Sequence, residues 1–471
     1  MQIDGFYDTI AAIATAEGPA GVAVVRLSGP TAWQVAAQVV QTRGAALTDR
    51  PAGHFFYARF QAPATGEHLD EGLVLLFRGP ASFTGEDVVE LQGHGSPVLV
   101  RAVLRAVLAA GARLAGPGEF TRRAFLHGKI DLTQAEAVMD LVQAQSERAA
   151  RAAQAQLCGQ LGAQVAEFYR ESTALCAEVA AQLDFEAEEL PAWVAHAAAQ
   201  RVAQLQTDIS QLLRTSREGQ LLRAGALVVM GGCPNAGKSS LLNLLLGSRR
   251  AIVSHEAGTT RDTLEEGIVL AGIPVRLVDT AGVREPTSPI EREGVTRAHQ
   301  ALQQADLILY LLDAARPLAA QHPHLMRQAF GPTPPPILLV WNKCDLAAPP
   351  PCDEELARCV PLALRPDAAR NPLRISAQTG AGLAELQAAL VACLGVDPAA
   401  PARATITERH RQELAQTAEA LAQVGGLLDR GELVLAAGEL RRGAEALGRI
   451  LGRTYSQDLL DAIFARFCVG K

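Results

Sequence analysis

The segment at residues 232–239 constrains this chain more than any other feature, and it reads Gly-Cys-Pro-Asn-Ala-Gly-Lys-Ser. It follows an apolar run at 226–230 and precedes a segment typical of a helix at 240–246. A strand, a glycine-rich loop and a helix in this order form a phosphate-binding loop. Its backbone N–H groups point at phosphate oxygens, Lys238 reaches the terminal phosphates and the Ser239 hydroxyl binds Mg²⁺. The chain is therefore predicted to bind a nucleoside triphosphate.

A second motif indicates which base is bound. It follows an apolar run at 337–340, typical of a buried strand, and reads Asn342-Lys343-Cys344-Asp345. The carboxylate of Asp345 accepts hydrogen bonds from N1–H and the 2-amino group of guanine, whereas adenine has no donors there. At this distance after a phosphate-binding loop the pattern predicts GTP, with Ser376 and Ala377 as a further element on the guanine side.

The parts that sense the γ-phosphate are predicted between these motifs, at 258–262 and 279–282. Thr260 is the expected second Mg²⁺ hydroxyl, and Asp279 the carboxylate that holds a water of the metal. Val283 occupies the position where many GTPases carry the glutamine that orients the attacking water, and an apolar side chain cannot do so. Another polar group must act, and the next loop offers Arg284, Glu285, Glu291, Arg292 and Glu293. Each of these is otherwise a solvated loop charge.

The motifs together predict one nucleotide site with Mg²⁺. Its candidate GTP-binding residues are Asn235, Ala236, Gly237, Lys238, Ser239, Ser240, Ser254, Thr259, Thr260, Asp279, Thr280, Ala281, Gly282, Asn342, Lys343, Asp345, Ser376 and Ala377. The candidate Mg²⁺ ligands are Ser239 and Thr260.

Length and composition limit the class of protein. The 471 residues suggest about three domains of roughly 150 residues, and 49% hydrophobic residues are enough for several cores. No run of 18 apolar residues and no basic, apolar leader occur, so we expect a cytoplasmic chain without a membrane span. The eight cysteines show no Cys-x-x-Cys spacing, which favours reduced thiols over disulfides or a zinc site.

The net charge of −7 and the pI of about 5.9 argue against a general nucleic-acid binder. An RNA contact must therefore be local. The candidate patches are Arg441, Arg442, Arg449 and Arg453, with Arg122 and Arg123 as a second group. A solvated helix face is the alternative for each group.

Composition divides the chain into four predicted segments. Residues 1–125 read as a mixed α/β domain, and 126–223 as a helical segment that opens with a capping box of Thr133 and Glu136. Residues 224–393 alternate strands and helices as in a doubly wound parallel sheet, and 394–471 are helical again. Neither helical segment alone can bury its apolar face, so the fold class is α/β multidomain, with a Ras-like GTPase domain inserted into one helical domain.

The C-terminal end carries a candidate catalytic thiol, Cys468, beside Lys471. An exposed thiol near an ammonium is a candidate nucleophile. A prenylation site fits poorly because the last residue is lysine and no polybasic run precedes it. A small apolar residue that ends a helix is the other alternative.

Five separated blocks resemble one family, the tRNA-modification GTPases known as MnmE or TrmE. They are Asp8-Thr9-Ile10-Ala11 with residues 21–29, Phe83-Thr84-Gly85-Glu86-Asp87 with 88–95, residues 117–126, residues 129–137, and the GTPase motifs with the terminal Cys-x-Gly-Lys. The resemblance extends over essentially the full length.

The resemblance implies a GTPase that acts with a flavin-dependent partner of the MnmG or GidA type. Together they would add a (carboxymethyl)aminomethyl group to carbon 5 of the wobble uridine, position 34, of certain tRNAs. The one-carbon donor would be 5,10-methylene- or 5-formyl-tetrahydrofolate, held in an N-terminal domain that also forms a homodimer, while the GTPase domains dimerise transiently. The positions that match the family's folate contacts are Arg26, Glu90, Lys129 and Lys471.

The resemblance also implies the hydrolytic carboxylate and a potassium site. Glu291 falls where the family carries its catalytic carboxylate. Asn235 matches a K⁺ ligand, and the segment 254–259 matches the loop that closes over the ion, with Ser254, Glu256 and Thr259 as candidate ligands. The sequence Ser254-His255-Glu256-Ala257 departs from the more apolar version expected in the family.

A function of another class remains open. The chain would then be a GTP-driven binding switch, akin to ribosome-assembly GTPases, whose other domains only dock to partners. The two functions differ in whether the domains outside the GTPase domain take part in one-carbon chemistry.

Overall fold

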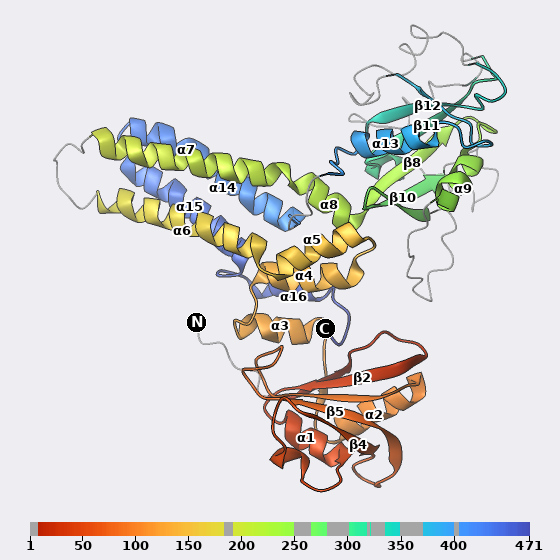
Figure 1. The fold of residues 1–471 in the computed structure, drawn as a ribbon. Helices are drawn as coiled ribbons and strands as arrows, with labels where there is room; N and C mark the ends of the chain where they lie inside the picture. Colours follow the sequence, from red (N-terminus) through yellow and green to blue (C-terminus); the bar gives the residue numbers. More distant parts are fainter. Residues whose placement is uncertain are drawn as a thin grey trace, which may run out of the picture. The chain divides into compact units, whose positions relative to one another are not determined.

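The computed structural model describes residues 8–182, 192–248, 265–279, 301–317, 321, 335–348, 371–399 and 405–471. These residues form two compact units (Figure 1). The first combines the chain up to Met139 with Leu157–Leu205 and Gln416–Lys471, and the second combines Asp140–Gln156 with Gln206–Ala415.

The N-terminal part of the first unit is a seven-stranded sheet in the order β3-β4-β5-β6-β2-β1-β7. All neighbouring strands are antiparallel except β1 and β7. The strands are β1 Ile10–Ile13, β2 Ala20–Ser28, β3 Val40–Gln41, β4 Phe55–Gln61, β5 His68–Phe77, β6 Val88–Gly95 and β7 Arg113–Leu114. Helices α1 (Ala32–Val39) and α2 (Pro97–Ala109) pack on one face, where alternate strand residues supply the core (Figure 1).

A buried arginine joins the motifs of this region. The Arg123 side chain is 0% exposed on α3 (Glu119–Leu126) and donates to Asp8, Glu86 and Glu119 over 2.8–3.1 Å. Arg113 bonds Asp8 and Glu119 as well, each at 2.7 Å. Burial raises the pKa of Asp8 and of Glu119, but the hydrogen bonds from the two arginines outweigh it and lower both values. The network pins the N-terminal segment to α3.

The second predicted RNA patch is therefore wrong. Arg123 cannot reach a polyanion because its guanidinium is enclosed by three carboxylates. Its neighbour Arg122 is also partly buried and pairs with Asp461 at 3.0 Å. A pair of adjacent arginines in the sequence does not reveal this, because the partners Asp8, Glu86 and Asp461 lie far away along the chain.

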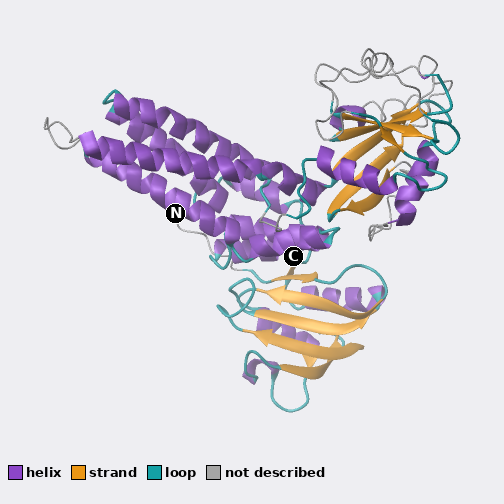
Figure 2. Cartoon of the chain, turned by 45° about the horizontal axis from the view of Figure 1, so that its top comes forward, coloured by secondary structure: helices purple, strands orange, loops and turns teal. Residues whose placement is uncertain are grey.

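Helices make up the rest of the first unit. Segments from before and after residues 206–415 pack together: the thiol of Cys176 on the earlier segment donates to the carbonyl of Ala437 on the later one at 3.4 Å. Figures 1 and 2 show α6 and α15 side by side. The helices that contribute are α3, α4 Leu132–Gln143, α6 Gln160–Ala181, α7 Ala192–Arg214, α14 Glu408–Asp429, α15 Leu433–Leu451 and α16 Gln457–Phe464. The predicted packing of the two helical segments against each other is confirmed.

Helix α4 begins with a capping box, but not the predicted one. Because the helix begins at Leu132, the residue before it, Asp131, caps it: its carboxylate accepts from the backbone N–H of Gln134 at 2.9 Å. In turn, Oε1 of the Gln134 side chain accepts from the backbone N–H of Asp131 at 2.9 Å. Thr133 donates to the Asp131 carboxylate at 2.6 Å, so the predicted pair of Thr133 and Glu136 is wrong by two residues.

The second unit holds a six-stranded sheet in the order β13-β12-β11-β8-β10-β9. Only β9 is antiparallel to its neighbour. The elements are β8 Ala226–Gly232, α9 Lys238–Ser248, β9 Glu265–Leu270, β10 Ile273–Asp279, β11 Leu307–Asp313, β12 Ile337–Asn342, β13 Leu373–Arg374 and α13 Leu383–Cys393. Helices α5 (Glu147–Leu157) and α8 (Ser216–Ala224) also belong to it. Strands β11 and β12 are buried throughout, as parallel strands covered on both faces are.

The predicted fold class is confirmed: a mixed α/β N-terminal part, a helical part and a mostly parallel GTPase-type sheet. The domain boundaries drawn from the sequence stay predictions. Within the described ranges, no helix has the length and apolar character needed to cross a membrane.

Candidate functional site

The predicted phosphate-binding loop connects β8 to α9 at the carboxyl end of β8. The strands beside β8 are β10 on one side and β11 on the other, so the loop lies where the strand order reverses, the usual ligand position in such sheets. Gly232 and Gly237 have φ values of +138° and +96°. A Cβ on Gly232 would lie 2.5 Å from the carbonyl oxygen of Leu311, and one on Gly237 would lie 2.2 Å from Nδ2 of Asn342. Both positions therefore need glycine.

Lys238 is the first residue of α9 and is buried. Its Nζ donates to the carbonyl oxygens of Gly232 at 2.9 Å and Cys233 at 3.1 Å. Burial lowers the pKa of Lys238, and the charge of Asp279 partly opposes this effect. An anion at the loop would stabilise this buried ammonium, and the N-terminus of α9 favours an anion at the same place. The loop therefore fits a phosphate chain.

Ser239 and Asp279 form the part of the site that fits Mg²⁺. The Ser239 hydroxyl donates to Oδ2 of Asp279 at 3.2 Å, and Asp279, the last residue of β10, is buried. A hydroxyl and a carboxylate beside the phosphate-binding loop are the hard oxygen donors that Mg²⁺ prefers.

Asn342 connects the phosphate-binding loop to the base-binding loop. Its side chain is nearly fully buried, with Nδ2 donating to the Ala236 carbonyl at 2.7 Å and Oδ1 accepting from the Ala377 N–H at 2.9 Å. Three segments predicted from separate motifs thus meet at one amide. The bond at each end fixes the amide orientation.

The residues after Asn342 present an exposed carboxylate from a fixed turn. Lys343 has a φ of +64°, and the Cys344 N–H donates to the Ile375 carbonyl at 3.1 Å. Ser376 is buried, and its hydroxyl accepts from the Thr379 N–H at 3.1 Å. Asp345 itself is exposed, which leaves its carboxylate accessible to a base.

Some predicted site residues lie outside the described residues. They are Ser254, Glu256, Thr259, Thr260, Thr280, Ala281, Gly282 and Glu291. Ser240 and Asn235 are described and exposed, in the first turn of α9 and in the loop before it.

The structure brings two of the four candidate folate residues into contact. Arg26 on β2 and Glu90 on β6 are register partners, and their side chains pair at 2.8 Å while 23% and 16% exposed. The Arg26 guanidinium lies 5.8 Å from the ring centre of Phe120, whose backbone N–H donates to the carbonyl oxygen of Lys471 at 3.2 Å. Lys129 follows α3 and donates to the Pro80 carbonyl at 2.8 Å.

Cys468 lies in an extended tail after α16, and it is exposed. The tail pairs with the segment before α3: Val469 bridges Pro117, and the Cys468 carbonyl accepts from the Gly118 N–H at 3.3 Å. The alternative that Cys468 is a small apolar residue ending a helix is therefore wrong, because α16 ends at Phe464.

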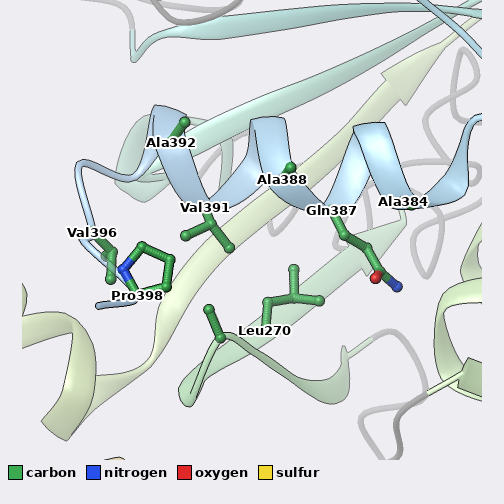
Figure 3. Close-up of a pocket in the computed structure, with 9 residues that line it drawn as sticks. Leu270, Ala384, Gln387, Ala388, Val391, Ala392, Val396 and Pro398 are labelled. Atoms are coloured by element: carbon green, nitrogen blue, oxygen red, sulfur yellow. The ribbon is translucent and has the colours of Figure 1, made fainter. Parts of the chain in front are cut away.

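A pocket of about 340 Å³ in the second unit is a separate feature (Figure 3). Its walls come from α13 and from the turn after β9, at the amino ends of the parallel strands and opposite the phosphate-binding loop. It is lined by Leu270, Ala271, Ala384, Gln387, Ala388, Val391, Ala392, Val396 and Pro398. The described residues that line this pocket include no cationic side chain, so the pocket does not suit a triphosphate.

Sequence reasoning missed two polar residues beside the nucleotide loops, Asp313 and Gln321. Asp313 ends β11, and its carboxylate accepts from Lys343 Nζ at 2.7 Å. An acidic residue at the carboxyl end of the strand next to β8 is a signal that could have identified it. No comparable sequence pattern could have identified Gln321.

Known proteins resemble this chain over nearly its whole length. A family model described as the MnmE helical domain matches residues 132–468, and one described as the GTP-binding protein TrmE N-terminus matches 9–129. Proteins named tRNA modification GTPase MnmE from Bordetella petrii and from Xanthomonas campestris pv. campestris (strain B100) are 43% and 44% identical over 468 residues. The match covers 98% of this chain and 98% or 99% of theirs. A solved structure of Aquifex aeolicus Era is 28% identical over 41% of this chain and 65% of that chain, with a TM-score of 0.27, too low to support an argument.

Proposed function

Because this chain belongs to the MnmE family of tRNA modification GTPases, we propose that its GTP hydrolysis serves the modification of a wobble uridine. With a flavin-dependent partner of the MnmG type, it adds a (carboxymethyl)aminomethyl group to carbon 5 of uridine 34 in certain tRNAs, in the cytoplasm. The match over 98% of both chain lengths carries this proposal, because it includes the N-terminal and helical parts besides the GTPase motifs. A binding switch without one-carbon chemistry would not require that N-terminal match.

The N-terminal sheet supports a folate site in this proposal. The Arg26–Glu90 pair offers a carboxylate acceptor and guanidinium donors, which suit the amide and amino edge of a pterin. The tail that carries Cys468 and Lys471 is hydrogen bonded to the same region through Gly118 and Phe120. A one-carbon tetrahydrofolate bound there would supply the carbon that is transferred.

The same sheet supports the proposed homodimer. Phe55, Tyr57 and Leu73 are 70%, 59% and 37% exposed. Strand alternation places them on the face opposite Ala58 and Phe60, which pack into the core under the helices. Exposed apolar side chains gathered on one face are typical of an interface.

Nucleoside analysis of tRNA tests the function. In a strain that lacks this protein, uridine 34 of the affected tRNAs should lose the modified nucleoside, and the wild-type chain should restore it. Glu90→Gln should fail to restore it while the purified variant still hydrolyses GTP. If deletion leaves the wobble nucleosides unchanged, the binding-switch function is favoured instead.

Glu291→Ala should slow GTP hydrolysis about 100-fold and leave GTP binding near normal. The reason is that a water-orienting carboxylate acts on the transition state and not on ground-state binding. Single-turnover hydrolysis and GTP titration of the variant measure the two effects separately. If the variant hydrolyses GTP at the wild-type rate in saturating K⁺, the carboxylate that orients the water is Glu285 or Glu293 instead.

GTP hydrolysis should also be several-fold faster in K⁺ than in Na⁺ at equal ionic strength. Asn235 is the described member of the proposed K⁺ site, and it is exposed in the phosphate-binding loop with a φ of +68°. A cation there would neutralise charge that develops between the β- and γ-phosphates, as an arginine finger does elsewhere. Steady-state rates in matched KCl and NaCl, for wild type and Asn235→Ala, check this. Equal rates of the wild type in both salts would show that the proposed K⁺ site is wrong.

A further inference from the structure

A chain of buried polar contacts joins the two nucleotide-binding loops through Asp313. The Asp313 carboxylate is 4% exposed at the carboxyl end of β11, and its Oδ2 accepts from Lys343 Nζ at 2.7 Å. Its Oδ1 accepts from the backbone N–H of Ala315 at 2.9 Å. Lys343 is the second residue of the base-binding motif, so its ammonium bonds a residue that lies on another strand.

Gln321 holds Asp313 from the other side. Its Oε1 accepts from the Asp313 N–H at 2.7 Å, and its Nε2 donates to the Asp313 carbonyl at 2.9 Å and to the Arg316 carbonyl at 3.1 Å. The Gln321 carbonyl accepts from the thiol of Cys233 in the phosphate-binding loop at 2.7 Å. Both Gln321 and Asp313 are buried, so these bonds are shielded from water.

Lys343 needs this support because its backbone is unusual. A φ of +64° is uncommon for a residue with a side chain, and it persists where surrounding contacts fix it. The bond to a buried carboxylate is charge-assisted and therefore stronger than a bond to a neutral acceptor. It limits the rotamers of a long side chain that otherwise has many, and it fixes the turn from which Asp345 projects.

We propose that Asp313, clamped by Gln321, is a positioning residue for guanine-nucleotide binding. It acts through Lys343: it holds the lysine side chain and its left-handed turn in the conformation that binds the nucleotide. Asp313 itself touches neither the base nor the phosphates. The site therefore binds GTP and GDP with a loop that is ordered before the ligand arrives.

Asp313→Asn tests the proposal with little change in shape. Asparagine keeps the acceptor for the Ala315 N–H but removes the charge that Lys343 bonds. We expect the dissociation constant for GDP to rise about tenfold, mostly through faster dissociation. The KM for GTP should rise by more than kcat falls, which loss of overall structure would not produce. Stopped-flow release of a fluorescent GDP analogue and steady-state hydrolysis measure these values.

A matched control lies next to the same strand. Asp306 immediately precedes β11, at the end opposite to Asp313, and its carboxylate accepts from the Leu227 N–H at 2.9 Å. Asp306→Asn makes the same chemical change to a bonded carboxylate, and GDP affinity should stay within twofold of wild type. An equal loss of affinity in both variants would overturn the proposal.

A double-mutant cycle decides whether Asp313 acts through Lys343. If it does, Asp313→Asn combined with Lys343→Met should bind GDP as Lys343→Met alone does. If the two losses multiply, the proposal is wrong. If Asp313→Asn does not fold, Gln321→Glu tests the proposal instead. This variant keeps the acceptor for the Asp313 N–H but loses the amide N–H that donates to the Asp313 carbonyl. It should weaken GDP binding at least threefold, and wild-type affinity would overturn the proposal.

Discussion

Gly237→Ala should raise the dissociation constant for GTP about 1,000-fold. The added Cβ would lie 2.2 Å from Nδ2 of Asn342, so the amide that connects the two loops must move. That movement breaks the bonds to Ala236 and Ala377, and a residue with a side chain is also strained at a φ of +96°. Two disrupted buried hydrogen bonds and the strain cost about 3–6 kcal/mol in total, and about 1.4 kcal/mol corresponds to tenfold in affinity.

Isothermal titration with a non-hydrolysable GTP analogue measures this loss, and the same helix offers a control. Gly247 lies near the end of α9, and a Cβ there would meet no atom within 4 Å. Gly247→Ala should therefore bind GTP as the wild type does and stabilise the helix slightly. If Gly237→Ala binds GTP within threefold of wild type, Asn342 does not connect the loops in solution.

The nucleotide site was predictable where a motif and its local structure coincide. The strand, loop and helix from β8 to α9 follow from an apolar run, two glycines and a lysine within a short stretch. The base-binding motif was predictable for the same reason, because it ends a fully apolar strand. In both cases the residues that define the chemistry are neighbours in sequence, so their relative placement needs no knowledge of the tertiary fold.

Contacts between distant segments could not be predicted in this way. Lys343 and Asp313 are separated by 30 residues, and only the pairing of β11 with β12 brings their strand ends together. Arg123 shows the same limitation in the N-terminal part, since its partner Asp8 lies 115 residues away. In each case the tertiary fold brings the charged residue to a partner that is distant in the sequence.

The prediction of the capping box of α4 was wrong for a different reason. The sequence near Asp131 contains two overlapping patterns that fit a helix start, one from Asp131 to Gln134 and one from Thr133 to Glu136. Propensity does not distinguish them. The position of α4 against its neighbours distinguishes the two patterns, because Leu132 is fully buried and is already the first helical residue.

Asp345→Asn should change the base that the site accepts. GTP affinity should fall by about 10²–10³-fold, because guanine N1–H and the 2-amino group then face an amide that presents its own donors, which leaves polar groups unpaired. Xanthosine triphosphate carries an oxygen in place of the 2-amino group, so the variant should bind it better than GTP. The structure favours this outcome: Asp345 is exposed, while Cys344 before it is fixed by a 3.1 Å bond to Ile375. The substitution should therefore change the binding group and leave the loop in place.

Competition between GTP and xanthosine triphosphate for a fluorescent nucleotide measures the change in specificity. Asp458→Asn is a suitable control, because Asp458 is an exposed carboxylate in the first turn of α16, in the other unit of the chain. It should leave both affinities unchanged. Unchanged GTP binding in Asp345→Asn would mean that this carboxylate does not contact the base. A loss of both nucleotides without a change of preference would mean that the loop itself had collapsed, and that the fixed turn at Lys343 depends on Asp345 as well as on Asp313.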